Sequence, residues 1–177
     1  MKKPLLILPS VFMLCFVFAC QDKEAMAELE KFRAQAKLEA ENKALALRLQ
    51  EASLKGDFEV IKEFMSPDYV FHDATGKDYS LEEMLEGMKR NKGMLSDMTI
   101  STEDLIVKGD KIVVRNTIKA THTGDIEGLP ATGNKVESRN IMIFRVENGK
   151  PVEGWEVNDL LSFYQQLGFE LKPKEEK

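Results

Sequence analysis

The sequence predicts an α+β fold in which helices come first and an antiparallel sheet follows. Apolar residues recur at helical spacing up to about Gly93, and from Met98 onward they alternate with polar residues as they do in strands. The dipeptide Asn148-Gly149 is a strong signal for a two-residue hairpin, because a type I′ turn needs positive φ at both central positions. Helices followed by a strand meander form an α+β pattern, and 177 residues have room for one ordinary domain.

The first 19 residues differ from the rest of the chain. Two lysines precede the apolar run Leu5–Phe18, and the residues Val-Phe-Ala-Cys close this segment at 17–20. This is the pattern of a secretory signal, and a cysteine directly after alanine resembles a bacterial lipobox, with cleavage before Cys20 and lipidation of its thiol. A plain signal peptide and an N-terminal membrane helix are the alternatives, although the apolar run is short for a membrane span. We therefore expect residues 1–19 to be a signal peptide and lipid to anchor the mature protein in a membrane of the cell envelope, facing the periplasm or the cell surface.

Composition excludes several kinds of chemistry. Cys15 and Cys20 are the only cysteines; the first would leave with the signal and the second would be lipidated, so the mature domain has no thiol for catalysis or metal binding. The net charge is −5, and loss of the two lysines in residues 1–19 gives −5 − 2 = −7. A mildly acidic domain without a basic cluster is a poor nucleic-acid binder.

Residues Gln21–Lys55 predict one long helix or two consecutive helices, because they contain neither Gly nor Pro and carry apolar residues at helical spacing. We expect residues 20–40 to be a helical or flexible spacer; a coiled coil is the alternative, but too few heptads are apolar. The domain is expected to span residues 41–171, with Gly56 ending its first helix. Residues 172–177 are expected to be a disordered tail.

Local signals divide the segment between the first helix and the sheet. Asp57 is suited to N-cap a short helix, which the sequence Ser-Pro-Asp at 66–68 ends. Tyr69–His72 predicts a short strand. Ser80 and Glu83 have the spacing of a capping box, and a helix with an apolar stripe follows them.

Four strands are expected in the second half of the domain. They are Met98–Val107, Lys111–His122, Val136–Val146 and the strand that follows Asn148-Gly149. Asn116 and His122 fall on the apolar face of the second strand, and Asn140 lies between apolar neighbours on the third. Because a buried amide must find hydrogen-bond partners, Asn116 and Asn140 are candidate polar groups of a pocket.

Asp159 is the first candidate for chemistry. Period-2 alternation places it on the same strand face as Trp155 and Val157, and a carboxylate in apolar surroundings tends to have a raised pKa and can act as a general acid or base. Trp155 is then a wall of the core or of a pocket. The other interpretation of Asp159 is local, because Asp is favoured as the N-cap of a helix such as Leu160–Leu167.

His72 and His122 are the only histidines. Either could polarise the carbonyl of a ligand, and either could equally be a strand-end histidine bonded to a loop carbonyl. A metal site is not expected, because two histidines at unrelated spacing match no ligand motif.

Several segments together resemble the SnoaL-like polyketide cyclase (ester cyclase) family. They are THTG at 121–124, GDIEGLPATG at 124–133, RVENGKPVEGWEVND at 145–159 and QQLG at 165–168. The resemblance runs back to about Asn42 and implies the nuclear transport factor 2-like fold, a curved antiparallel sheet with helices that close a conical pocket. It also implies chemistry without a metal or cofactor, and it carries the role of catalytic acid or base onto Asp159 and a pocket position onto His72.

Two functions remain open at this point. The first is cofactor-independent acid/base chemistry of the cyclase, isomerase or hydrolase type on a small hydrophobic carbonyl compound, with Asp159 moving a proton and His72 or another polar group steadying the enolate. The substrate-binding residues would be Trp155, His122, Asn116 and Asn140. The second is a non-catalytic envelope lipoprotein that binds a small apolar ligand or a partner protein. The resemblance further implies that a homodimer can form through the convex sheet face, where Ile141 and Ile143 are expected.

Overall fold

The computed structural model describes residues 8–126, 128–170 and 172, with side chains from Lys23 onward. The chain divides into two compact units, with the boundary between Leu38 and Glu39. The second unit, residues 39–177, contains the sheet and the site described below.

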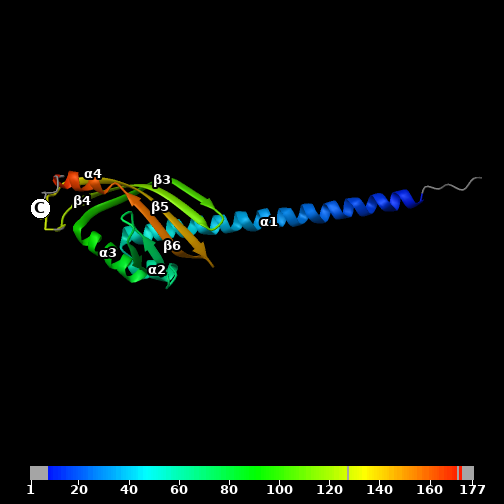
Figure 1. Cartoon of the computed structure of the whole chain (residues 1–177), viewed down its shortest axis with the longest axis horizontal. Helices are drawn as coiled ribbons and strands as arrows, with labels where there is room; N and C mark the ends of the chain where they lie inside the picture. The colour runs from blue at the N-terminus through cyan, green and yellow to red at the C-terminus, as the bar shows by residue number, and fades with distance from the viewer. Residues whose placement is uncertain (1–7, 127, 171, 173–177) are drawn as a thin grey trace, which may run out of the picture. The chain divides into compact units, whose positions relative to one another are not determined.

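The described residues form four helices and a six-stranded curved sheet, which confirms the predicted α+β class (Figure 1). The helices are α1 (Leu8–Lys55), α2 (Phe58–Phe64), α3 (Leu81–Met94) and α4 (Leu160–Leu167). The strands are β1 (Val70–His72), β2 (Asp78–Ser80), β3 (Leu95–Lys108), β4 (Lys111–His122), β5 (Lys135–Glu147) and β6 (Lys150–Asn158).

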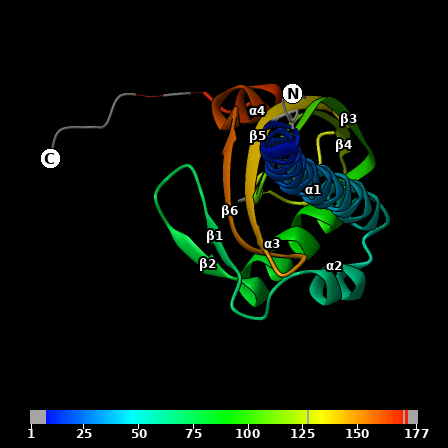
Figure 2. The same ribbon diagram turned by 90° about the vertical axis from the view of Figure 1, so that its right-hand side faces the viewer.

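The sheet has the order β2-β1-β6-β5-β4-β3. The last four strands form the expected antiparallel meander, whose long β3/β4 and β4/β5 ladders curve over α2 and α3 (Figure 1). The short hairpin β1–β2 extends the sheet beside β6 (Figure 2), and β1 runs parallel to β6. The sheet is therefore mixed, whereas the sequence predicted a purely antiparallel one and did not indicate β2.

The segment before Gly56 forms one helix, α1, rather than two. Gly56 follows its last residue with a φ of +72°, as a glycine that ends a helix does. Within the second unit, α1 buries Leu45, Ala46 and Ala52 in the main core. Among the described residues, no helix combines the length and the hydropathy that crossing a membrane requires.

The predicted signal peptide and tail lie partly outside the described residues. Residues 1–7 and 173–177 are not described, and neither is the side chain of Cys20. Export, lipidation of Cys20 and the boundaries of the spacer therefore stay predictions.

Both predicted helix caps are confirmed. The Asp57 carboxylate accepts a hydrogen bond from the backbone N–H of Val60 at the start of α2. At the start of α3 the Ser80 hydroxyl accepts from the Glu83 N–H, and the Glu83 carboxylate accepts from the Ser80 N–H, so the capping box is complete.

The hairpin signal is confirmed as well. Asn148 and Gly149 join β5 to β6 with φ angles of +51° and +76°, as a type I′ turn requires. The inner face of the sheet packs on the helices through a core of which Tyr69, Leu81 and Ile112 are fully buried members. A second, smaller cluster forms around Leu167 of α4. Residues of both clusters line a space that the side chains do not fill.

Candidate functional site

A cavity of about 1160 Å³ lies between the inner face of the sheet and the helices of the second unit. Its lining is mainly apolar and comes from all four helices, the β1–β2 hairpin and the meander strands. The apolar lining includes Leu49, Phe58, Ile61, Phe71, Met84, Met88, Leu105, Val114, Met142, Phe144 and Phe163. A cavity of this size and character can enclose a small, largely hydrophobic molecule.

One row of polar side chains crosses the apolar floor of the cavity. In the sheet register Thr102 of β3 lies opposite Asn116 of β4, Asn116 opposite Asn140 of β5, and Asn140 opposite Asn158 of β6. Directly opposed residues place their side chains about 5 Å apart on the same face, so these four form a continuous row. The three asparagines line the cavity, and we call them the amide row.

The amide row is connected to its surroundings at its β3 end. The Thr102 hydroxyl lies 3.0 Å from Asn116 Oδ1 and 2.8 Å from Oε1 of Gln50, a cavity residue of α1. Asn116 and Asn140 are only 7% and 5% exposed. Both were predicted as polar pocket groups, and both are found in the cavity lining.

The cavity lining also contains a half-buried carboxyl group. Glu156 lies on the inner face of β6, two residues before Asn158, and its Oε1 accepts a hydrogen bond of 2.5 Å from Asn140 Nδ2. Burial raises the pKa of Glu156 above its usual range, while the hydrogen bond from Asn140 acts in the opposite direction. A carboxyl group whose pKa is raised is suited to act as both an acid and a base.

A second carboxylate of the lining has the opposite environment. The hydroxyl of Thr75 and the backbone N–H of Lys77 donate to Asp73, and these bonds lower its pKa to about 2. Asp73 therefore stays ionised and is a weak base. Two carboxyl groups with pKa values pushed apart are typical of acid/base sites, and here Glu156 is the one that can exchange a proton.

Tyr69 packs against Gly154 on the inner face of β6. Burial raises the pKa of Tyr69, and the charge of Glu156 raises it further. Its hydroxyl is buried without a hydrogen-bond partner among the described residues. The ring reaches this position because residue 154 is glycine: a Cβ there would overlap the Tyr69 hydroxyl.

Asp159 lies outside the cavity lining. It is exposed and N-caps α4, where its carboxylate accepts the backbone N–H of Ser162 at 3.1 Å. The structure thus shows the second of the two interpretations of this residue, and it does not bring Asp159 to the cavity. Trp155 and Val157, which share its strand face, also lie outside the lining.

A β-bulge decides which face of β6 lines the cavity. Next to the hairpin, Glu147 pairs with Lys150 and Val146 with Pro151, but beyond the bulge Arg145 pairs with Glu153 and Met142 with Glu156. An unbroken register would place Trp155 opposite Met142. The extra residue shifts β6 by one position, and such a shift exchanges the two faces of a strand.

The two histidines are likewise absent from the lining. His72 stacks on Trp155 with ring centroids 5.1 Å apart, and its Nδ1 lies 2.7 Å from Asp78 Oδ1. His122 is fully buried, and its Nδ1 accepts the backbone N–H of Thr132 at 3.2 Å. His72 and Trp155 therefore lie together, but neither they nor His122 join the amide row.

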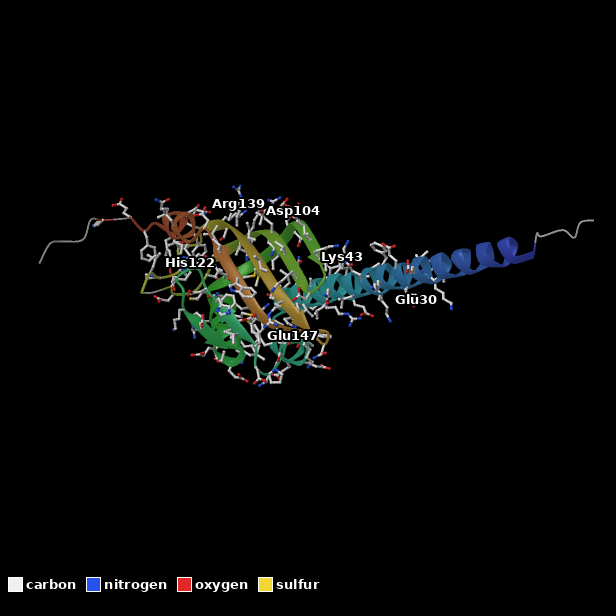
Figure 3. All side chains as sticks on the ribbon, turned by 45° about the vertical axis from the view of Figure 1, so that its right-hand side comes forward. Glu30, Lys43, Asp104, His122, Arg139 and Glu147 are labelled. Carbon is white, nitrogen blue, oxygen red and sulfur yellow. The ribbon has the colours of Figure 1, made fainter. Side chains whose placement is uncertain are left out.

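The outer face of the sheet is polar over much of its area; Asp104 and Arg139 project from it in Figure 3. No group of three or more His, Cys, Asp or Glu side chains within the described ranges has the geometry to hold a metal ion. The polar groups of the cavity lining include amides, hydroxyls and carboxyl groups, together with the exposed Arg90 and Lys92, and they suit an organic ligand with oxygen substituents.

Sequence reasoning missed Glu156 and Asn158. The signal that could have found them is their alternation with Trp155 and Val157, since one of these two sets had to face inward. The bulge that selects between the sets has no clear signature in the sequence.

A curved sheet closed by helices around a cavity is the nuclear transport factor 2-like fold. The sequence model of the SnoaL-like polyketide cyclase family matches residues 43–167. The chain belongs to this family. No curated protein matches the chain.

Several solved structures are similar to this chain. AclR, a proposed hydroxylase from Streptomyces galilaeus, is 28% identical with a TM-score of 0.69, over 73% of this chain and 97% of AclR. IdmH, a proposed polyketide cyclase from Streptomyces antibioticus, is 29% identical with a TM-score of 0.65, over 71% of this chain and 97% of IdmH. TsrD from Streptomyces laurentii is 29% identical with a TM-score of 0.65, over 73% of this chain and 96% of TsrD.

Proposed function

We propose that this protein is an enzyme of acid/base chemistry that moves a proton on a small, largely hydrophobic carbonyl compound, with Glu156 as the acid and base. The observation that carries the proposal is the position of Glu156, which is half-buried in the cavity lining, is held by Asn140 and has a raised pKa. The apolar lining would bind the hydrocarbon part of the ligand, and the amide row would bind its oxygen substituents.

The proton would move in two steps. Ionised Glu156 takes a proton from the carbon next to the carbonyl group, and the electron pair of that C–H bond passes to the carbonyl oxygen as an enolate. Asn116 uses its side-chain oxygen toward Thr102, so its amino group is the part it can offer to this oxygen. Glu156 then returns the proton to a carbon, which isomerises the compound, or to the oxygen formed when the enolate closes a ring by adding to a second carbonyl.

The comparisons support this reaction class without identifying the substrate. IdmH is described as a polyketide cyclase and AclR as a hydroxylase. Cyclisation is therefore the first reaction we propose for this chain, with isomerisation and hydrolysis on the same cavity as its variants. No step in the proposed sequence requires a cofactor.

A non-catalytic binding protein is the second candidate. It is favoured by the position of Asp159, because the residue to which the family resemblance assigns catalysis caps a helix on the surface. The catalytic role of Asp159 stays a prediction, and the variants described below test it separately from the role of Glu156.

The cellular setting is part of the proposal. The basic and apolar start of the chain and the Val-Phe-Ala-Cys sequence at 17–20 support export and lipidation at Cys20. Labelled fatty acid should enter the wild-type protein and not the Cys20→Ser variant. The exposed Ile141 and Val157 are cross-strand partners on the outer sheet face, and they support a homodimer through that face.

The experiment that tests the catalytic proposal needs no physiological substrate. Small hydrophobic ketones and diketones are incubated with the protein in deuterated water, and exchange of the protons next to the carbonyl is followed by NMR. We expect the wild type to catalyse exchange, and Glu156→Gln to reduce the rate by about 10²–10⁴-fold, the usual contribution of a general base.

The matched control is Asp159→Asn, which removes the other candidate carboxylate. We expect this variant to keep the wild-type exchange rate. Loss of exchange in Asp159→Asn with full activity in Glu156→Gln would return the catalytic role to Asp159. Tight binding of the ketones without exchange by the wild type would favour the binding protein.

A further inference from the structure

We propose that Asn140 is the positioning residue of the cavity carboxyl group, and that its side-chain amide serves both protonation states of Glu156. It donates to the carboxylate and, after a half turn, accepts from the carboxylic acid. This inference rests on the proposed role of Glu156 as an acid and base, and it assigns a second residue to that site.

The contact between the two side chains is short and enclosed. Asn140 Nδ2 lies 2.5 Å from Glu156 Oε1, and the two residues come from adjacent strands of the sheet. Asn140 is flanked in the amide row by Asn116 on β4 and Asn158 on β6. Its amide therefore lies between neutral polar neighbours, and Glu156 is the one charged group to which it is bonded among the described residues.

The other half of the same amide has no partner. Asn140 Oδ1 is buried and accepts no hydrogen bond within the part of the chain that the structure describes. An ionised carboxylate only accepts, so it requires the amino group of Asn140 and leaves the amide oxygen unsatisfied. A buried acceptor without a donor is destabilising. The observed orientation of the Asn140 amide therefore suits the ionised form of Glu156 only.

Protonation of Glu156 creates the missing donor. The carboxylic acid O–H can donate to Asn140 Oδ1 once the amide has turned, so the oxygen that is unpaired in the ionised state becomes paired. An asparagine can make both contacts, whereas aspartate could only accept and leucine could do neither. A carboxyl group that first takes up a proton and then releases it needs a partner that can both donate and accept, as Asn140 can.

Few other charges face this pair. The Tyr69 hydroxyl lies against Gly154 on the inner face of β6, and it interacts electrostatically with Glu156. The remaining charged residues of the described lining are Asp73, Glu83, Arg90, Lys92 and Asp97, and all except Asp73 are exposed. From α1 and β4 the lining offers the uncharged side chains of Gln50 and Asn116. Asn140 is therefore the residue whose removal should change the titration of Glu156 most directly.

The test is a carboxyl titration by NMR on the full chain labelled with ¹³C-glutamate, in which the Glu156 signal is identified by its loss in Glu156→Gln. Asn140→Leu should raise the pKa of Glu156 by about one pH unit, the contribution of one hydrogen bond to a charged group. Asn140→Asp should raise the pKa further, because a second carboxylate disfavours ionisation of the first.

Asn116→Leu is the matched control, since it removes an equally buried amide from the adjacent strand without touching Glu156. We expect it to leave the Glu156 pKa unchanged. An unchanged pKa in Asn140→Leu, or an equal change in Asn116→Leu, would overturn the proposal. Should either leucine variant fail to fold, the two alanine variants are compared with the same expectations.

Rotation of the Asn140 amide can be followed by NMR separately from the Glu156 titration. The side-chain ¹⁵NH₂ signal of Asn140 should shift with the midpoint of the Glu156 titration in the wild type and stay constant in Glu156→Gln. A constant signal in the wild type would contradict the half turn. The exchange assay keeps the two proposals apart: if Glu156→Gln retains activity while Asn140→Leu moves the Glu156 pKa, the catalytic role fails and the positioning role stands.

Discussion

Burial and one hydrogen bond act in opposite directions on the carboxyl group of Glu156. Burial disfavours the ionised form and raises the pKa, and the amide of Asn140 stabilises the ionised form and lowers it. The net result is a raised pKa, which means that the folded protein holds the proton of Glu156 to a higher pH than the unfolded chain does. This difference makes stability depend on pH.

Glu156→Gln should therefore stabilise the protein at neutral pH. In the wild type, stability falls as the pH rises from the unfolded pKa of about 4.3 to the raised folded pKa, and the loss persists above it. The variant should gain about 1.4 kcal/mol for each pH unit by which the folded pKa exceeds the unfolded one. Urea unfolding of both proteins between pH 3 and 8 measures this gain.

The gain should disappear below about pH 4, where the glutamate is protonated in the folded and unfolded states alike. A difference between the two proteins that is the same at every pH would mean that Gln changes packing and not ionisation. A loss of stability at pH 7 would contradict the raised pKa.

Gly154 has a steric role at the same site. Because Gly154 has no side chain, there is room for the Tyr69 ring, which is almost fully buried against the inner face of β6. Gly154→Ala would place a methyl group on the Tyr69 hydroxyl, and overpacking of this kind destabilises by about 1–3 kcal/mol. Thermal unfolding with Gly87→Ala as the control tests this prediction.

Gly87 is the contrasting position. It lies in α3, and the only atom near an added Cβ would be the Arg90 guanidinium at 3.7 Å. Alanine is favoured over glycine in a helix, so the control should be stabilised by about 0.5–1 kcal/mol. Equal effects of the two substitutions would show that Tyr69 moves away without cost.

The strand β6 is the element that decides which residues can act. Its bulge near the hairpin turns Glu156 and Asn158 toward the cavity and Trp155 and Val157 to the outside. The hairpin itself could be predicted from Asn148-Gly149, because that dipeptide satisfies a local requirement of the turn. The bulge could not, because it follows from the pairing of two complete strands.

The helix α4 gives a direct test of the role of Asp159. Asp159→Ala removes the acceptor for the Ser162 N–H and should lower the free energy of unfolding by about 1 kcal/mol. Asp159→Asn keeps an acceptor and should be close to neutral, as measured by denaturant unfolding. Equal losses in the two variants would mean that the charge, rather than the cap, stabilises this end of the helix.

At the scale of the whole molecule, the fold class and family could be predicted because their signals are local and repeated. The Asp57 cap, the Ser80–Glu83 capping box and the alternation along β4 each depend on neighbours within a few residues. The positions of Asn116 on β4 and Asn140 on β5, each among apolar neighbours, made both residues candidates for the pocket. Asn158 and Glu156 depend on the register of β6, and the parallel contact of β1 with β6 joins segments that are distant in the chain.

The lining shows why the site forms a unit. Each residue of the amide row comes from a different strand, so the row exists only when the meander has paired in its final register. Burial in the cavity lining then raises the pKa of Glu156, and the hydrogen bond from Asn140 acts against this rise. Fold and acid/base properties are consequences of the same arrangement.

The pH dependence of ketone exchange tests the central claim most directly. The rate should rise with pH through one ionisation, and its midpoint should equal the pKa of Glu156 measured by carboxyl titration in the same protein. Glu156→Gln should remove this ionisation from the profile together with most of the rate. A profile with the same midpoint in Glu156→Gln, or a midpoint that differs from the titration of Glu156, would contradict the claim that this carboxyl group is the base.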